Sequence, residues 1–219
     1  MTIFTDWSLV PEHHYDVLYV DPPWKYFGDP NKDQAAGKHY PCMTVEEIAE
    51  KFPLKPKLLD RALVFLWVTS PRQFDAFELV KLWGLYYRGV AFNWVKTDKY
   101  GNIVSGKGVR PTVTHTTSEF VWAVSNVEFG RPLPVLDESV EQVVPAPYPK
   151  VHSRKPERVR RNIERVVAST ARLEMFARGG PVPGWDRWGN EVHEGLMDPP
   201  EMPKTRTRAT IRSRSPKKP

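Results

Sequence analysis

The chain has 219 residues, of which 40% are hydrophobic and 12% aromatic, enough to bury one sizeable core. No apolar run reaches the roughly 18 to 20 residues that cross a bilayer, and the single cysteine, Cys42, excludes an intrachain disulfide and a thiolate metal cluster. The formal net charge is +6, and seven basic but no acidic side chains fall within residues 203–219, which leaves −1 for the rest. We expect a soluble, cytoplasmic protein with one domain, residues 1–197, and a disordered basic tail, residues 198–219.

The first half of the chain alternates between strand and helix patterns. Residues 16–20 and 62–68 are short apolar stretches rich in β-branched and aromatic residues, and each predicts a buried strand. Residues 72–83 predict a helix, because apolar side chains recur there at helical spacing and Gly84 follows as a C-terminal stop. The side chains that define this helical spacing are Phe74, Phe77, Val80 and Trp83.

The second half continues the alternation. Its sequence predicts strands at 87–95, 120–124 and 172–177, and a helix at 157–168 that is opened by Pro156. Strands that alternate with helices predict an α/β layered fold with a mostly parallel sheet. Two long irregular stretches, 25–43 and 126–152, interrupt the pattern, and loops of this length in a compact domain are usually functional or disordered.

The tetrapeptide Asp21-Pro22-Pro23-Trp24 follows the first predicted strand directly. A carboxylate and a backbone carbonyl are two acceptors that can hold the hydrogens of a delocalised amine, such as N6 of adenine, while that nitrogen becomes tetrahedral. The prolines fix the backbone and remove competing amide donors, and the tryptophan offers a flat face to an extruded base. Taken alone, however, Asp-Pro-Pro is more often an ordinary turn at the end of a strand.

Further blocks follow this motif in order, and together with it they resemble the MT-A70 family of adenine-N6 methyltransferases. The blocks are residues 20–24, 39–44, 65–69, 93–97, and 173–178 with 184–185 and 189–191. The resemblance implies S-adenosylmethionine as cofactor and Asp21, Pro22, Pro23 and Trp24 as catalytic residues. It also implies a Rossmann-like fold with helices on both faces of the sheet, in a permuted order with the catalytic motif N-terminal and the cofactor-binding motifs C-terminal.

The same resemblance assigns four cofactor-binding residues. Lys155 matches a lysine at the methionine end of the cofactor, Arg178 a ribose-binding arginine, and Asn190 and Glu191 the pair near the ribose and adenine. A lysine just ahead of a helix N-terminus does suit a carboxylate, although outside these motifs a solvated basic residue would be the ordinary interpretation. Only 20 residues precede Asp21, so we expect the family's N-terminal strand, which helps hold the cofactor adenine, to be shortened or missing.

Candidate substrate-binding residues besides Trp24 are Tyr40, Lys96 and Glu119. Tyr40 resembles a tyrosine of a substrate loop, although a core or rim position fits nearly as well. Lys96 either reaches a nucleic-acid phosphate or caps the sheet, and Glu119 could line the pocket. Residues 106–117 depart from the pattern of relatives, which leaves the approach of substrate undefined. The basic tail, residues 203–219, is expected to contact phosphates, or else serves only as a solubilising end.

We therefore predict direct, metal-free transfer of a methyl group to adenine N6 in DNA. Adenosine in RNA is the nearest alternative, and the lack of an appended RNA-reading domain favours DNA. An inactive nucleic-acid-binding scaffold is a second alternative, which the intact Asp21 and Trp24 disfavour. Methylation of a protein amide ranks last, because such sites typically begin with Asn. Nucleic acid is the expected partner, a membrane is not, and a homodimer or heterodimer is compatible with the resemblance.

Overall fold

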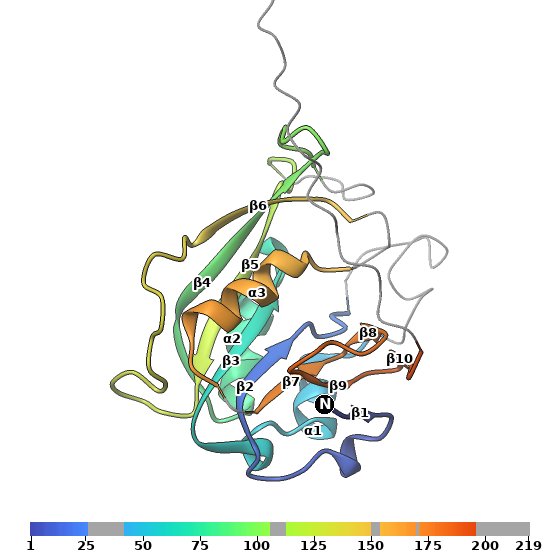
Figure 1. The fold of residues 1–219 in the computed structure, drawn as a ribbon, viewed down its shortest axis with the longest axis vertical. Coiled ribbons are helices and arrows are strands. Elements are labelled where there is room, and N and C mark those ends of the chain that lie inside the picture. The colour runs from blue at the N-terminus through green and yellow to red at the C-terminus, as the bar shows by residue number, and fades with distance from the viewer. Residues whose placement is uncertain (26–41, 106–112, 150–153, 170, 196–219) are drawn as a thin grey trace, which may run out of the picture.

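Eight strands form one sheet in the order β1-β9-β7-β2-β3-β5-β4-β6 in the computed structural model (Figure 1). The structure describes residues 1–25, 42–105, 113–149, 154–169 and 171–195. β5 is antiparallel to β3 and β4, and the other pairings in this sheet are parallel. The strands are β1 (Ile3–Phe4), β2 (Tyr15–Val20), β3 (Leu58–Val68), β4 (Tyr86–Thr97), β5 (Ser118–Ser125), β6 (Val143–Pro147), β7 (Arg172–Met175) and β9 (Asp186–Trp188).

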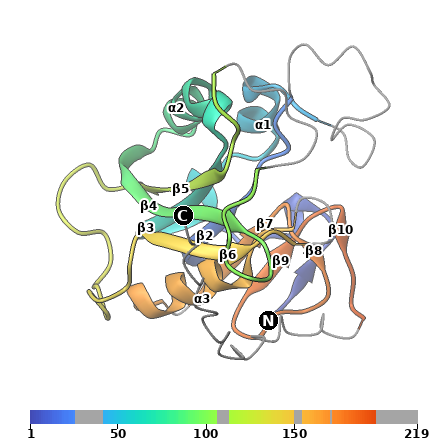
Figure 2. The ribbon, with the colours of Figure 1, turned by 90° about the horizontal axis from the view of Figure 1, so that it is seen from above.

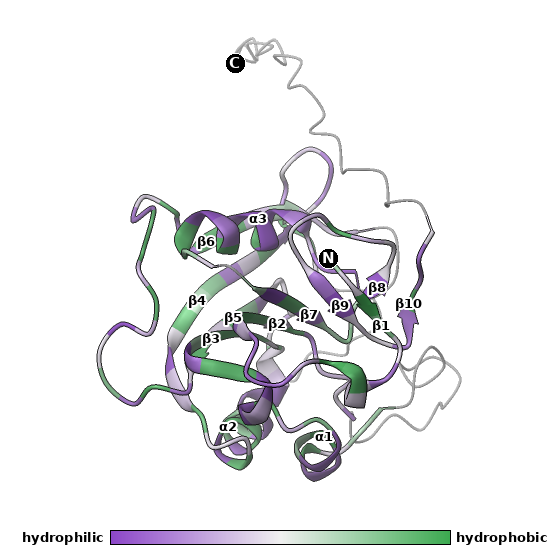
Figure 3. Ribbon diagram, turned by 60° about the horizontal axis from the view of Figure 1, so that its bottom comes forward, coloured by the Kyte–Doolittle hydropathy of each residue, from purple (hydrophilic) through white to green (hydrophobic). Residues whose placement is uncertain are grey.

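Helices cover both faces of this sheet, which confirms the predicted α/β layering. Helices α1 (Val45–Lys51) and α2 (Gln73–Leu82) pack on one face, and α3 (Glu157–Val166) packs on the other (Figure 2). Successive side chains of a strand point to opposite faces. Along β3, Leu66 therefore joins the core beneath α1 and α2, whereas Trp67 joins the core beneath α3. Figure 3 shows the apolar central strands between the two helical layers.

Helix α2 buries a face that only partly matches the one its sequence suggested. Phe74 is 90% exposed and Phe77 is 46% exposed, so the predicted stripe is only partly buried. The buried side chains are spaced i, i+3, i+4 and i+7, which is the usual spacing of a core-facing stripe: they are Ala76, Leu79, Val80 and Trp83. Phe77 instead lies at the edge of this stripe, where its ring centroid is 4.5 Å from that of Trp122.

Several elements were not predicted from the sequence. The stretch 126–152, expected to be irregular, contains β6, which pairs with β4 at the end of the sheet. Its two prolines, Pro145 and Pro147, are tolerated because an edge strand has no partner on one side. α1 was also missed; it is short, and Thr44 and Glu47 form a capping box at its start.

A second, two-stranded sheet pairs β8 (Arg178–Gly179) with β10 (Glu191–Val192). It follows β7, which ends at Met175, two residues before the predicted end of that strand, because Phe176 turns to a positive φ of 55°. None of the helices in the described ranges is long and apolar enough to cross a membrane. The predicted tail, residues 198–219, lies outside the described residues.

Candidate active site

The topology of the sheet brings charged side chains from distant parts of the chain to one edge. Parallel strands end at the same edge, and an antiparallel strand begins there. Asp21 follows the end of β2, Lys96 lies at the end of β4, and Glu119 lies at the start of the antiparallel β5. Lys155 comes just before α3, which packs against this sheet. This is the edge at which open α/β sheets bind ligands.

These four side chains form one ion-pair cluster in which positive and negative charges alternate. Lys155 Nζ lies 3.1 Å from Asp21 Oδ1 and 3.3 Å from Glu119 Oε2. Glu119 Oε1 in turn lies 2.7 Å from Nζ of Lys96, a side chain with only 6% of its surface exposed. The Lys155 ammonium also lies over the ring of Trp67, 5.1 Å from the ring centroid. The sequence had singled out all four charged residues, but it gave no indication that they touch one another.

The pKa values of the two carboxylates in this cluster, Asp21 and Glu119, are shifted in opposite directions. Burial raises the pKa of Asp21, Lys155 lowers it, nearby Glu119 raises it, and the net result is a raised pKa. For Glu119, burial alone would raise the pKa, but Lys155 and Lys96 outweigh burial and hold the pKa below its ordinary value. Glu119 is therefore a stable anion at neutral pH, whereas Asp21 takes up a proton more readily than an ordinary aspartate.

The backbone of the Asp-Pro-Pro-Trp motif is held by hydrogen bonds on both sides. The N–H of Trp24 donates to the carbonyl of Pro22 over 2.9 Å, and the N–H of Met43 donates to the carbonyl of Pro23 over 2.9 Å. A carbonyl oxygen has two lone pairs, so Pro22 keeps one acceptor position. The Trp24 side chain is 5% exposed within the core beneath α1 and α2. In this structure the indole thus supports the motif, and base stacking on it stays a prediction.

Two cavities meet at the motif. The first, about 370 Å³, opens beside Lys155 and the start of α3, and the second, about 320 Å³, opens beside Asn190 and Glu191. Asp21, Phe176 and Arg178 line both. The cofactor-binding residues that the sequence predicted are therefore divided between two adjoining hollows, with Asp21 on the wall that the hollows share.

The turn after β7 shapes this shared wall. Phe176 has a positive φ, and the backbone there lies so close to Gly189 that a Cβ on the glycine would sit 2.4 Å from the carbonyl oxygen of Ala177. Only glycine fits such a close approach of two backbones. Arg178 follows in β8, and its Nε lies 3.1 Å from Oε2 of Glu191 in β10. Glu191 is thus already paired with the arginine proposed to bind the same ribose.

The second cavity also receives residues that the sequence had not suggested. β1 is present, with two residues, and pairs with β9, so the N-terminal strand is short but not missing. Thr5, Asp6 and Trp7 follow it and line the second cavity together with Asn190. Asp6 Oδ1 accepts hydrogen bonds from the backbone N–H and the hydroxyl of Ser8, at 2.8 and 2.9 Å. The Asp-x-Ser pattern is the signal that could have revealed this turn.

The side chains around the two cavities fit S-adenosylmethionine. The ammonium of Lys155 suits a carboxylate, and the carboxylates of Asp21 and Glu191 suit an amine and hydroxyl groups. Cavities of this size match a ligand of a few tens of atoms. Of the other predicted site residues, Tyr40 lies outside the described residues, as does the basic segment 203–219.

Comparisons with known proteins identify the relatives of this chain. The family model MT-A70 matches residues 15–191. The "Type II methyltransferase M.MunI" of Mycoplasma sp is 27% identical over 208 residues, which cover 87% of this chain and 83% of that protein. The "N(6)-adenosine-methyltransferase catalytic subunit METTL3" of Homo sapiens is 27% identical over 189 residues, 84% of this chain but 30% of METTL3. A "Probable N(6)-adenosine-methyltransferase MT-A70-like" of Oryza sativa subsp. japonica is 26% identical over 180 residues, 82% of this chain and 23% of the relative.

Proposed function

The chain belongs to the MT-A70 family, whose methyl donor is S-adenosylmethionine, and on that premise we propose that it methylates N6 of adenine in DNA. The observation that carries the proposal is the position of Asp21. Its carboxylate follows the end of β2 on the wall between two cavities, and Lys155 holds it from one side at 3.1 Å.

The cofactor would extend across both cavities. Lys155, beside the first cavity, would hold the carboxylate of the methionine end, since a compact ammonium suits such a partner. Arg178 and Glu191 would hold the ribose, and Asn190 and Asp6 would bind at the adenine end. A carboxylate such as that of Asp6 can accept a hydrogen from the exocyclic amine of an adenine.

Asp21 and Pro22 would position the target amine. Lys155 engages Oδ1 of Asp21, which leaves Oδ2 to accept one amine hydrogen, while the second lone pair of the Pro22 carbonyl accepts the other. When bound, S-adenosylmethionine supplies an electrophilic methyl group on a positively charged sulfur. The raised pKa of Asp21 suits a group that receives the proton released from N6. Positioning of the amine would supply most of the rate enhancement.

DNA is favoured over RNA because the alignment with M.MunI, a type II methyltransferase, extends over 208 residues, against 189 and 180 residues for the N(6)-adenosine-methyltransferases of human and rice. RNA adenosine remains the second candidate, because relatives named for it align over more than four-fifths of this chain. Phosphate contacts by the basic segment 203–219 and assembly as a homodimer or heterodimer belong to the same proposal.

Methyl transfer to isolated DNA and RNA tests the proposal. The purified full chain, given S-adenosylmethionine with a labelled methyl group, should label adenine in duplex or single-stranded DNA, with N6-methyladenine identified by mass spectrometry. Asp21→Ala should abolish labelling, whereas Asp60→Ala, which removes an exposed carboxylate near the start of β3, should not. Labelling confined to RNA would overturn the choice of polymer. Labelling that persists in Asp21→Ala would overturn the mechanism, and a wild-type chain that binds DNA without labelling it would indicate an inactive scaffold.

A further inference from the structure

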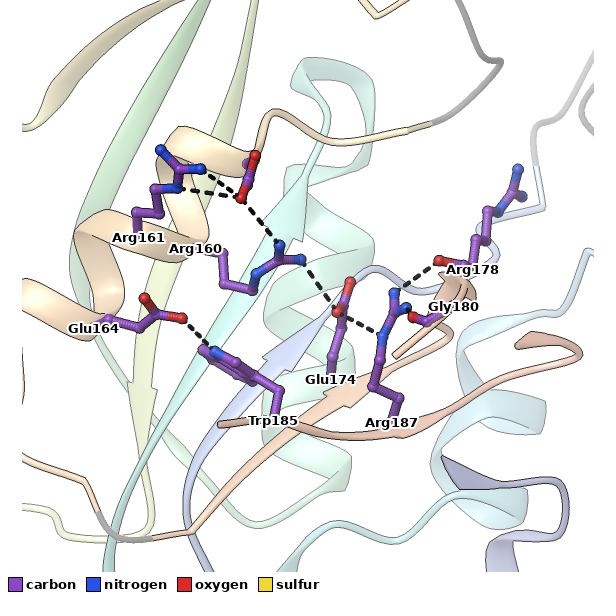
Figure 4. A network of polar contacts seen from close by, with 9 residues as sticks. Arg160, Arg161, Glu164, Glu174, Arg178, Gly180, Trp185 and Arg187 are labelled. Atoms are coloured by element: carbon purple, nitrogen blue, oxygen red, sulfur yellow. Dashed lines mark hydrogen bonds and ion pairs between the residues drawn. The ribbon is translucent and has the colours of Figure 1, made fainter. Parts of the chain in front are cut away.

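Arg187, on β9, is a buried arginine whose three side-chain nitrogens all have protein partners. The side chain is 4% exposed, and its Nε lies 3.1 Å from Oε2 of Glu174 on the neighbouring strand β7. Its two terminal nitrogens donate to main-chain carbonyls, one to Arg178 over 2.7 Å and the other to Gly180 (Figure 4). Although Arg187 lines the first cavity, its nitrogens are thus engaged by the protein itself.

The two carbonyls belong to the segment that carries the proposed cofactor-binding arginine. Within the described residues, β8 and β10 pair only with each other and are not hydrogen-bonded strands of the large sheet. One main-chain bond, from Ala177 N–H to the Trp188 carbonyl at 2.9 Å, precedes β8. Beyond it, the two terminal nitrogens of the Arg187 guanidinium, its fork, connect the large sheet to the carbonyls of Arg178 and Gly180, on both sides of Gly179.

We infer that Arg187 is a positioning residue that sets the affinity for the cofactor by fixing the backbone of Arg178. The inference rests on the proposed function, in which Arg178 and its partner Glu191 bind the ribose. Figure 4 shows the Arg178 side chain extending away from Arg187, while its main-chain carbonyl faces the Arg187 guanidinium. Arg187 therefore acts through the main chain, and its planar fork can hold two carbonyls at a fixed spacing, which a lysine cannot.

Loss of the Arg187 guanidinium should change the structure only near β8 and β10. Glu174 has a second cationic partner, because Nη1 of Arg160, in α3, lies 3.6 Å from Oε2 of Glu174. Without the Arg187 guanidinium, Glu174 would still face a cation. The carbonyls of Arg178 and Gly180 would each lose the donor that Arg187 supplies, beside a cavity that water can enter. The expected consequence is a mobile β8–β10 pair on an otherwise folded sheet.

Direct binding of S-adenosylhomocysteine to the full chain by calorimetry tests the inference without requiring turnover. We expect Arg187→Met to raise the Kd at least 10-fold and Arg187→Lys to raise it by a smaller factor. In methylation assays, KM for the cofactor should rise by a similar factor while kcat stays within about threefold. Arg88→Met is the matched control, because Arg88 also donates to two loop carbonyls, those of Glu128 and Gly130. Arg88 lies near the start of β4, whereas the site lies at the end of β4, beside Lys96. Its Kd should stay within twofold of wild type.

Hydrogen exchange on the unliganded protein supplies a readout independent of any ligand. Amides of 178–180 and 191–193 should exchange faster in both Arg187 variants, whereas those of β2 and β3 should not. A Kd within twofold of wild type in a folded Arg187→Met protein would overturn the inference. So would faster exchange throughout the sheet, since the role would then be general stability. A wild-type chain that binds S-adenosylhomocysteine without methylating nucleic acid would overturn the proposed function alone.

Discussion

The ammonium of Lys155 lies 3.1 Å from the carboxylate of Asp21 and is shared with a second carboxylate, that of Glu119. Lys155 thus belongs both to the predicted cofactor site and to the electrostatic setting of the proposed catalytic carboxylate. Any substitution in this cluster changes the charge that Asp21 faces, and the directions of the resulting changes can be stated in advance.

The pKa of Asp21 should move in opposite directions in two variants. Lys155→Met removes the largest influence that lowers this pKa, so the pKa should rise further above its ordinary value. Glu119→Gln removes a carboxylate that raises it, so the pKa should fall. Titration of 13C-labelled aspartate carboxyls by NMR, with Asp21→Asn to assign the signal, measures both. Because the proposed reaction needs the carboxylate, the acidic limb of kcat/KM should shift in the same directions, and parallel shifts in the two variants would contradict the assignment.

Asp6→Ala should weaken cofactor binding with little change in kcat. The carboxylate lines the second cavity near the predicted adenine end, and its loss removes one charge-assisted acceptor, so the Kd for the cofactor should rise severalfold. Asp6→Asn is the control for the turn, since Asn also accepts the bonds from Ser8 and still offers a carbonyl oxygen to an amine. Calorimetry with S-adenosylhomocysteine checks both, and equal affinities for wild type and Asp6→Ala would exclude this contact.

Gly189→Ala should destabilise the protein and weaken cofactor binding together. The added Cβ would lie 2.4 Å and 2.6 Å from backbone atoms of Ala177, which cannot rotate away, so overpacking of about 1–3 kcal/mol is expected. Thermal unfolding should show a fall of about 2–4 °C in Tm for each kcal/mol. Gly101→Ala places its Cβ where no atom lies within 4 Å, in a backbone of positive φ (89°) that Gly189 does not share, so it should leave cofactor affinity unchanged even where it lowers stability.

Two apolar residues of α2 should differ sharply in their contribution to stability. Leu79 is fully buried, so Leu79→Ala should cost about 2–5 kcal/mol. Phe74 is 90% exposed on the same helix, and Phe74→Ala should change the free energy of unfolding by no more than about 0.5 kcal/mol. Urea denaturation of both variants measures the difference, and a large loss for Phe74→Ala would mean that this face is covered.

Local patterns in the sequence predicted the central elements because those elements carry their own signals. β2 and β3 contain continuous apolar runs, residues 17–20 and 62–68, that end at polar residues, and Gly84, with a φ of 65°, follows the end of α2 as expected. The face of α2 was harder to predict, since Phe74 and Phe77 are as apolar as the residues that are buried. β8 and β10, each of two residues, have no periodicity from which they could be recognised.

The residues of the site could be named from motifs, but their contacts could not. Lys96 and Glu119 are 23 positions apart and meet only because β5 runs antiparallel to β4, with Trp94 opposite Glu119. Arg187 gave no signal in the sequence, because its partners are a strand neighbour and two main-chain carbonyls. Asp6 was missed for a related reason: its place beside the second cavity depends on the pairing of β1 with β9, between residues more than 180 positions apart.

The wall shared by the two cavities has a consequence for inhibition. Asp21, Phe176 and Arg178 line both hollows, so a cofactor that spans the pair cannot bind while either hollow is filled. A fragment held by Lys155 and Arg178 alone, or one held by Asp6 and Asn190 alone, would compete with the entire cofactor. The two fragments would also be near enough to join across Arg178, and the linked compound would gain from the proximity of its halves.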